Sequence, residues 1–513
     1  MGIRPQKTKW HIACLAVTIS FNAPAETYYW RGYTYGLDPS MQIDREAKFP
    51  SPSSVCKVVH AYLISIPDTW VKDTTPILTT EDRGKCWSTG FDRFGTYHAF
   101  NYGFFSRTGN YCDPDSSSYN PVSGDCLQQK GEPDTDQSCQ STPASPTVGN
   151  PINTASGNKF QAELDYSFHN NSPPLRLKRY YNSLDGIWRH NYSAHLSITD
   201  WAIALTNDTG REIYFTRSGS SVTPLATDND HLIKSNNLWI YTSIKNEKLI
   251  FDESGKLVSI QTSGHPQQNL TYGTNGLINV TDNLGNTLTF TEDSDRQPLS
   301  LSAPGVQITY SYNANKRLTS VNRTTGGQTT QRHYHYEVPD KPDLLTGITD
   351  ERGVRYATWT YDDQGRAISS EHAAGADKVT VAYNSDGTVS VTNELGKVAK
   401  YSFQTIRGVR RITAIDGEPS PNCPNSNSTF TYDERGLLKS KTDNKGILTT
   451  YDYNERGLEV SRTEASGTPQ ARTITTTWHP DWFLPVTITE PDRITQYTYD
   501  NQGRQTSQSV TQR

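Results

Sequence analysis

The sequence predicts an all-β fold, and three observations indicate it. The 513 residues include 29 Tyr, 36 Gly and 28 Pro but only 2 Met, a mixture that favours strands and turns over long helices. Stretches such as 357–363, 449–454 and 495–501 alternate with the period of two expected of a strand. A Tyr-Asp/Asn-x-x-Gly unit also recurs along the second half of the chain, which is typical of stacked repeats.

The amino terminus is typical of a secretory signal peptide. Residues 1–25 carry Arg4, Lys7 and Lys9, then a mostly apolar run, then Ala-Pro-Ala at 23–25. A buried segment of a cytosolic domain is the alternative. No later run is apolar enough for a transmembrane span. We therefore expect Sec-type export to the periplasm, the medium or the cell surface.

Residues 26–141 are rich in aromatic residues and cysteine, and they predict a small β-rich domain with disulfides. We expect two bridges among the five cysteines, with the remaining thiol free or joined to Cys423; the pairing stays open. Zinc is the alternative, which the lack of a C-x-x-C pair disfavours. Residues 142–148 are polar and contain proline, so they predict a linker. The candidate disulfide residues are Cys56, Cys86, Cys112, Cys126 and Cys139.

Residues 246–513 hold the repeat, and 149–245 precede it. The Asp or Asn of each unit can bond its own backbone while the Gly supplies a positive φ, so each unit predicts a strand, a turn, a strand and a turn. Single hairpins cannot bury a face, so the units must stack into one sheet. We expect each Tyr ring to pack on the next unit with its hydroxyl in water. The signature residues, which we expect to be structural, are Tyr361, Asp362, Gly365, Tyr383, Asn384, Gly387, Tyr432, Asp433, Gly436, Tyr453, Asn454, Gly457, Tyr499, Asp500 and Gly503.

These units resemble the YD repeat of the RHS family. The preceding segment is similar to the domain that commonly opens an RHS repeat region, and the resemblance covers 149–513. It implies a β-hairpin spiral that forms part of a hollow shell, which in RHS proteins encloses a C-terminal toxin segment released near a DPxGL motif. The matching segments are GNPIN at 149–153, SGNK at 156–159, RYYNS at 179–183 and GIWRHNY at 186–192.

The chain departs from the family pattern at its carboxyl end. No DPxG-like closure or toxin domain follows Tyr499, and the sequence ends at Arg513. We therefore expect the front part of a longer shell, or a piece that a partner completes: the remaining RHS core, or a toxin segment on another chain. An unpaired edge over 495–513 invites such pairing.

The sequence offers little chemistry of its own. No HExxH, GxSxG, phosphate-loop or EF-hand motif is present, so we expect no enzyme, no cofactor and no metal site. His333 and His335 share a strand face but lack a third ligand, and His190 and His195 favour packing over catalysis. The acidic stretches 112–125 and 131–139 could bind calcium, but solvated turns are favoured.

Charge and aromatic content narrow the function. With 49 basic and 54 acidic residues, the net charge of −5 argues against nucleic acid as a partner. Our first hypothesis is an exported RHS scaffold that encapsulates or delivers a polymorphic toxin in contact-dependent competition. The alternative is a cell-surface carbohydrate-binding or adhesion module, because aromatic faces stack on sugars. The possible glycan contacts are Trp359, Trp478 and Trp482.

Overall fold

A computed structural model describes most of the chain. It covers residues 29–34, 47–66, 71–108, 112, 118–128, 130, 146–168, 175–225, 231–263, 265–417 and 426–513. The expected signal peptide, the acidic stretch 131–139, residues 113–117 of the stretch 112–125, Cys139 and Cys423 lie outside the described residues. No helix within the described ranges is long and apolar enough to span a membrane.

The amino-terminal domain is a four-stranded antiparallel sheet covered on one face by a helix. The strand order is β1-β4-β3-β2, and α1 packs on the face that buries Cys86 and Ser88. The helix begins after Ser51, whose hydroxyl accepts the backbone N–H of Ser54 at 3.1 Å. The elements are β1 (Tyr29–Thr34), α1 (Pro52–Ile64), β2 (Val71–Thr80), β3 (Arg83–Phe91), β4 (Tyr97–Thr108), β5 (Ser118–Tyr119) and β6 (Cys126–Leu127).

Two disulfides hold this domain together, as expected from the sequence. Cys56 of α1 joins Cys86 of β3, and Cys112 joins Cys126 of β6. The first bridge ties the helix to the centre of the sheet. The spacing of cysteines alone left this pairing open.

The segment that precedes the repeat forms small sheets. The order β11-β10-β9 makes one sheet and β12-β13-β14-β15 another. Thr147 and Val148 pair with β8, so they belong to a hairpin and not to the linker expected over 142–148. The strands are β7 (Thr147–Val148), β8 (Ile152–Asn153), β9 (Phe160–Ser167), β10 (Arg176–Asn182), β11 (Trp188–His190), β12 (His195–Ile198), β13 (Ala202–Thr206), β14 (Glu212–Ser218) and β15 (Ser221–Pro224).

A single antiparallel sheet of 26 strands makes up the remainder, with each strand paired to its neighbours in chain order. It begins at His231, ahead of the boundary expected at 246. A short 3-10 helix, η2 (Ala373–Gly375), interrupts one connection. The strands are β16 (His231–Ser235), β17 (Leu238–Thr242), β18 (Lys248–Phe251), β19 (Leu257–Gln261), β20 (Gln268–Tyr272), β21 (Leu277–Asp282), β22 (Thr287–Glu292), β23 (Pro298–Ala303), β24 (Val306–Tyr312), β25 (Leu318–Thr325), β26 (Gln328–His335), β27 (Gly347–Thr349), β28 (Arg355–Tyr361), β29 (Ala367–His372), β30 (Val379–Tyr383), β31 (Val389–Thr392), β32 (Val398–Ile406), β33 (Val409–Gly417), β34 (Ser428–Tyr432), β35 (Leu438–Thr442), β36 (Leu448–Tyr453), β37 (Glu459–Glu464), β38 (Arg472–Trp478), β39 (Pro485–Thr489), β40 (Arg493–Tyr499) and β41 (Gln505–Gln512).

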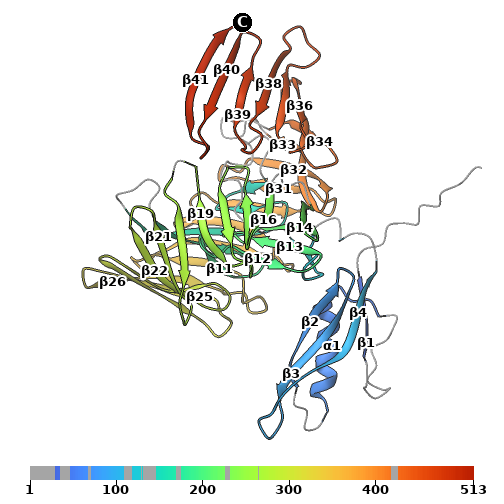
Figure 1. The fold of residues 1–513 in the computed structure, drawn as a ribbon, viewed down its shortest axis with the longest axis vertical. Coiled ribbons are helices and arrows are strands. Elements are labelled where there is room, and N and C mark those ends of the chain that lie inside the picture. The colour runs from blue at the N-terminus through green and yellow to red at the C-terminus, as the bar shows by residue number, and fades with distance from the viewer. Residues whose placement is uncertain are drawn as a thin grey trace, which may run out of the picture.

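The large sheet winds around the small sheets, which fill its inner side (Figure 1). One core cluster joins Leu177, Trp188 and Leu205 of the small sheets to strands from β16 to β28. A second joins Val148 and Ile152 to strands from β29 to β35. The described residues of 146–215, which we call the filling segment, therefore form the apolar surface on which the repeat strands bury one face.

Candidate functional site

The turns of the repeat share one backbone geometry, and most of them share the side-chain bonding that Asp362 illustrates. Its carboxylate accepts the backbone N–H groups of Gln364 at 3.0 Å and Arg366 at 2.9 Å. Gly365 adopts φ +82°, in the region that only glycine enters easily. This is the turn chemistry that the sequence predicts. The same positive φ occurs at the signature glycines Gly387, Gly436, Gly457 and Gly503.

Six tyrosines of the described repeat each join their hairpin to the one before it. Tyr361 Oη donates to the carbonyl oxygen of Leu345 at 2.6 Å, so the prediction that these hydroxyls stay in water is wrong. Burial raises the pKa of Tyr432 to about 12, because the phenolate has lost its solvent. The other pairs of tyrosine hydroxyl and carbonyl are Tyr272–Leu257, Tyr312–Pro298, Tyr383–Ala367, Tyr432–Ile412 and Tyr499–Pro485.

A buried network of hydrogen bonds connects the filling segment to the large sheet. Arg179 is 1% exposed, and it donates to Asp165 at 2.5 and 2.9 Å and to the hydroxyl of Tyr334 at 2.9 Å. Tyr310 donates to the same carboxylate at 2.7 Å. Asp165 and Arg179 come from β9 and β10, and the tyrosines come from β24 and β26. The network therefore joins the large sheet to the filling segment.

Lys159 and Trp359 make a second contact of this kind. The Lys159 ammonium lies 4.1 Å from the Trp359 ring and donates to the Asn150 carbonyl at 2.7 Å and to Gln161 at 2.8 Å. The indole N–H donates to the Asn150 carbonyl at 2.8 Å. Trp359 is 1% exposed, so it offers no face to a sugar, contrary to its choice as a possible glycan contact.

The other two tryptophans are half-buried and lie near the end of the sheet. Trp478 donates from its indole to the carbonyl of Glu459 at 2.8 Å. Trp482 lies 4.1 Å beneath the Lys248 ammonium. Glycan contact at these two residues stays a prediction.

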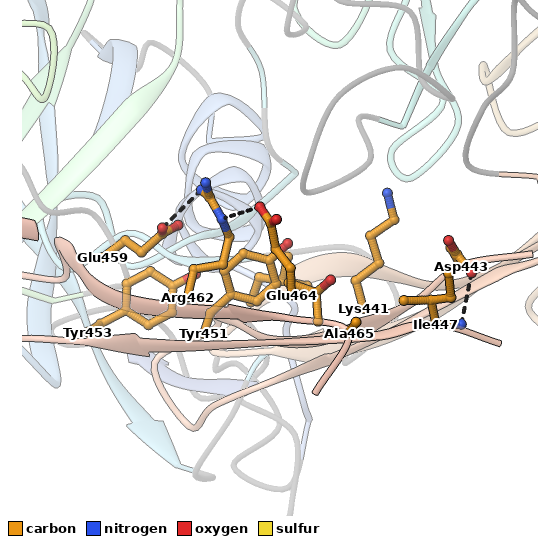
Figure 2. A pocket seen from close by; sticks show the side chains of 11 residues that line it. Lys441, Asp443, Ile447, Tyr451, Tyr453, Glu459, Arg462, Glu464 and Ala465 are labelled. Carbon is orange, nitrogen blue, oxygen red and sulfur yellow. Dashed lines mark hydrogen bonds and ion pairs between the residues drawn. The ribbon is translucent and has the colours of Figure 1, made fainter. Parts of the chain in front are cut away.

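The inner face becomes polar beyond the filling segment. Phe430, the last phenylalanine of the second core, pairs with Lys441, so Lys441 lies on the same face. A hollow of about 530 Å³ opens there over β35, β36 and β37. Figure 2 shows its side chains on one side of the sheet. The lining residues are Leu438, Lys441, Asp443, Ile447, Thr449, Tyr451, Tyr453, Glu459, Arg462, Glu464 and Ala465.

Charges in the hollow are paired and partly desolvated. Arg462 lies 3.1 Å from Glu459 and 3.3 Å from Glu464. Burial raises the pKa of Glu459 against the opposing effect of Arg462, and burial lowers the pKa of Lys441. Two tyrosine rings among alternating charges suit contact with a polar chain through many weak interactions.

Three of the four histidines named from the sequence have ordinary hydrogen-bond partners, and the fourth, His333, is exposed. His190 is fully buried, with Nε2 at 2.9 Å from Glu292 Oε2. His195 Nδ1 lies 3.0 Å from the carbonyl of Ser193, and burial lowers the pKa of His195 to about 4. His335 Nε2 lies 2.8 Å from the Thr349 hydroxyl. Within the described part of the chain, no group of three His, Cys, Asp or Glu side chains could hold a metal ion.

Two family models match the chain. Residues 149–215 match a domain of unknown function, DUF6531, and residues 432–469 match the RHS repeat. This chain contains an RHS repeat. The second match begins at Tyr432 and includes Tyr453, so the matched RHS repeat contains two of the tyrosine units described above. No curated protein sequence matches the chain.

Several solved structures resemble this RHS-repeat chain at low identity. The TcdB2-TccC3 crystal structure without the hypervariable C-terminal region is 11% identical, covers 69% of this chain and 24% of that chain, and has a TM-score of 0.33. For TcdB2-TccC3-TEV the identity is 10%, the coverage is 86% and 26%, and the TM-score is 0.35. A Photorhabdus luminescens Tc holotoxin pore is 11% identical, covering 84% and 24%, with a TM-score of 0.26. The chain spans about a quarter of the length of these structures.

Proposed function

We propose that the chain is part of an exported RHS shell that encloses a polypeptide toxin for contact-dependent competition, with no catalytic activity of its own. One observation carries the proposal. The sheet returns on itself, so that the loop between β38 and β39 rests on the turn between β17 and β18. We call this contact the seam; it comprises residues 243–248 and 479–484.

The seam is built from a two-way amide contact. The side chain of Asn246 donates to the carbonyl of Phe483 at 3.2 Å and accepts the backbone N–H of Phe483 at 2.7 Å. The ring of Phe483 stacks on His231, with centroids 5.6 Å apart. A contact across 237 residues of sequence joins the strand ends of successive windings, which makes the sheet a curved wall.

Two further features support this function. The polar hollow over β35 to β37 lies on the inner face beyond the filling segment, where a guest chain has room. The two disulfides suit an oxidising compartment and therefore export through the predicted signal peptide. The partner in this proposal is the remaining RHS core or a toxin segment, on this chain or on another.

The test uses the longest natural product that contains this chain, purified from its source. Limited proteolysis followed by mass spectrometry should reveal a segment that resists cleavage only while the shell is closed. We expect Asn246→Ala to open the seam and to increase the cleavage rate of that segment several-fold. Asn315→Ala, at an exposed turn of the same sheet, is the matched control and should leave protection intact.

Two results would contradict the shell. One is the absence of any protected segment in the natural product. The other is specific binding on a glycan array that is lost in Trp482→Ala, which would favour the carbohydrate-binding alternative. Burial of Trp359 already weakens that alternative.

A further inference from the structure

The hairpin between β3 and β4 ends in a rigid turn of residues 92–96. The Asp92 carboxylate accepts the backbone N–H groups of Phe94 at 2.8 Å and Thr96 at 2.9 Å, and its second oxygen lies 2.9 Å from His98 Nε2. Gly95 adopts φ +81° to close the turn. The side chains of the turn are therefore held in place before any partner arrives.

This turn displays aromatic side chains to solvent. Phe94 is 78% exposed, Phe91 59% and Tyr97 57%, and we call these three residues the aromatic tip. All four exposed phenylalanines of the described residues lie between positions 91 and 104. Phenylalanine is normally buried, so such a concentration indicates an interaction surface.

The aromatic tip lies at the end of the domain that is remote from the large sheet. At the opposite end of β3, the Glu81 carbonyl accepts the Tyr119 hydroxyl at 2.9 Å, and the nearby Pro121 carbonyl accepts the Trp201 indole at 2.9 Å. β3 has 9 residues, a length of about 30 Å. Figure 1 shows this hairpin pointing away from the rest of the molecule.

Apolar groups surround the tip on more than one side. Phe91 and Tyr97 pair across the hairpin on the face away from α1, with ring centroids 5.4 Å apart. Ile64, at the end of α1 on the other face, is 53% exposed. A protein pocket would cover one face and leave the other in water. A fluid apolar medium covers both faces and the apex together.

The charges at the tip suit a bilayer with anionic head groups. The Arg93 guanidinium lies 4.8 Å from the Phe94 ring, while the Asp92 carboxylate keeps its charge and is bonded by the backbone N–H groups of Phe94 and Thr96 and by His98. Aromatic rings with adjacent cations favour the membrane interface. We propose that the aromatic tip inserts into the interfacial layer of an anionic lipid bilayer and anchors the protein there.

Vesicle flotation of the full chain tests this anchor, with vesicles of phosphatidylcholine and phosphatidylglycerol in equal parts. We expect the wild-type chain to float, and Phe91→Ser with Phe94→Ser to lower partitioning at least about tenfold. The matched control is Leu284→Ser with Leu395→Ser, which removes residues 62% and 76% exposed on turns of the large sheet. It should float like wild type.

Fluorescence of a Phe94→Trp variant reports insertion when it is compared with that of wild type, which already contains 10 tryptophans. The fluorescence of the variant should shift to the blue when vesicles are added, and brominated lipid should quench it. Three results would overturn the anchor. The wild-type chain would fail to float with the vesicles, the Phe91→Ser with Phe94→Ser variant would float like wild type, or the emission of the Phe94→Trp variant would not change when vesicles are added. An emission shift that appears on addition of other proteins but not on addition of lipid vesicles would also overturn the anchor. The experiment does not involve the seam, so its failure leaves the shell proposal untouched.

Discussion

At the scale of single residues, the tyrosine of each unit has a role that its sequence position does not reveal. The acceptor of Tyr361 is the carbonyl of Leu345, which belongs to the preceding hairpin. The alternating pattern predicts on which face of the sheet the tyrosine ring lies, but it does not predict which group accepts the hydrogen bond of the hydroxyl. Only the stacking of hairpins brings a carbonyl to that point.

We predict that Tyr361→Phe destabilises the protein by about 1 kcal/mol, because the carbonyl of Leu345 loses a buried donor while the ring packing remains. The measurement is the free energy of unfolding in urea. Tyr97→Phe, whose side chain is 57% exposed, is the control and should change stability little. An equal loss in both variants would contradict the role of the buried hydroxyl.

His195 should make the protein less stable in acid. Burial, and then Arg296, lower the pKa of His195 from 6.5 to about 4. The unfolded chain therefore binds more protons between these values, and stability falls as the pH drops from about 6.5 to 4. Urea unfolding at several pH values should show a weaker pH dependence in His195→Gln over this window. An unchanged slope would contradict the shift.

At the scale of elements, the register shifts explain why the sheet winds. Several hairpins contain a bulge directly before the repeat tyrosine, between Thr360 and Tyr361 for example. A bulge increases the local right-handed twist of a strand pair. The same shift precedes other repeat tyrosines, namely Tyr312, Tyr432, Tyr453 and Tyr499.

The contact between the large sheet and the filling segment depends on Asp165 and Arg179. We predict that Asp165→Leu destabilises the protein by about 3–5 kcal/mol, because it leaves a buried guanidinium unpaired. The double variant Asp165→Leu with Arg179→Met should lose less than the single one, since no charge is stranded. Urea unfolding of both variants measures the difference, and a double variant that is less stable than Asp165→Leu would contradict the prediction.

At the scale of the whole molecule, the amino-terminal domain has a core separate from those of the large sheet. Its cluster contains Trp30, Val55 and Phe105 and, among the residues that the structure describes, none beyond 105. Cys56→Ser with Cys86→Ser should therefore lower the stability of this domain by about 2–4 kcal/mol. Hydrogen exchange should show lost protection in the described parts of 47–108 and unchanged protection in 231–513. Loss in both regions would mean that the two parts unfold together.

The sequence by itself determined the all-β class, the hairpin repeat, its turns and the presence of two disulfides. These features depend on neighbours within a few residues: Asp362 bonds its own turn, and Gly365 supplies its own φ. The RHS resemblance extended the prediction to the segment before the repeat, which one of the family models matches.

Only the tertiary structure decided how distant parts meet. Asn246 reaches Phe483 across 237 residues, and Trp359 is covered by Lys159 from the filling segment. Such contacts depend on the total twist that accumulates over many strand pairs, and a local sequence pattern does not predict that total twist. Trp359 is buried because the winding of the large sheet brings the filling segment over it, whereas Phe94 is exposed because it lies at the end of a hairpin in the amino-terminal domain.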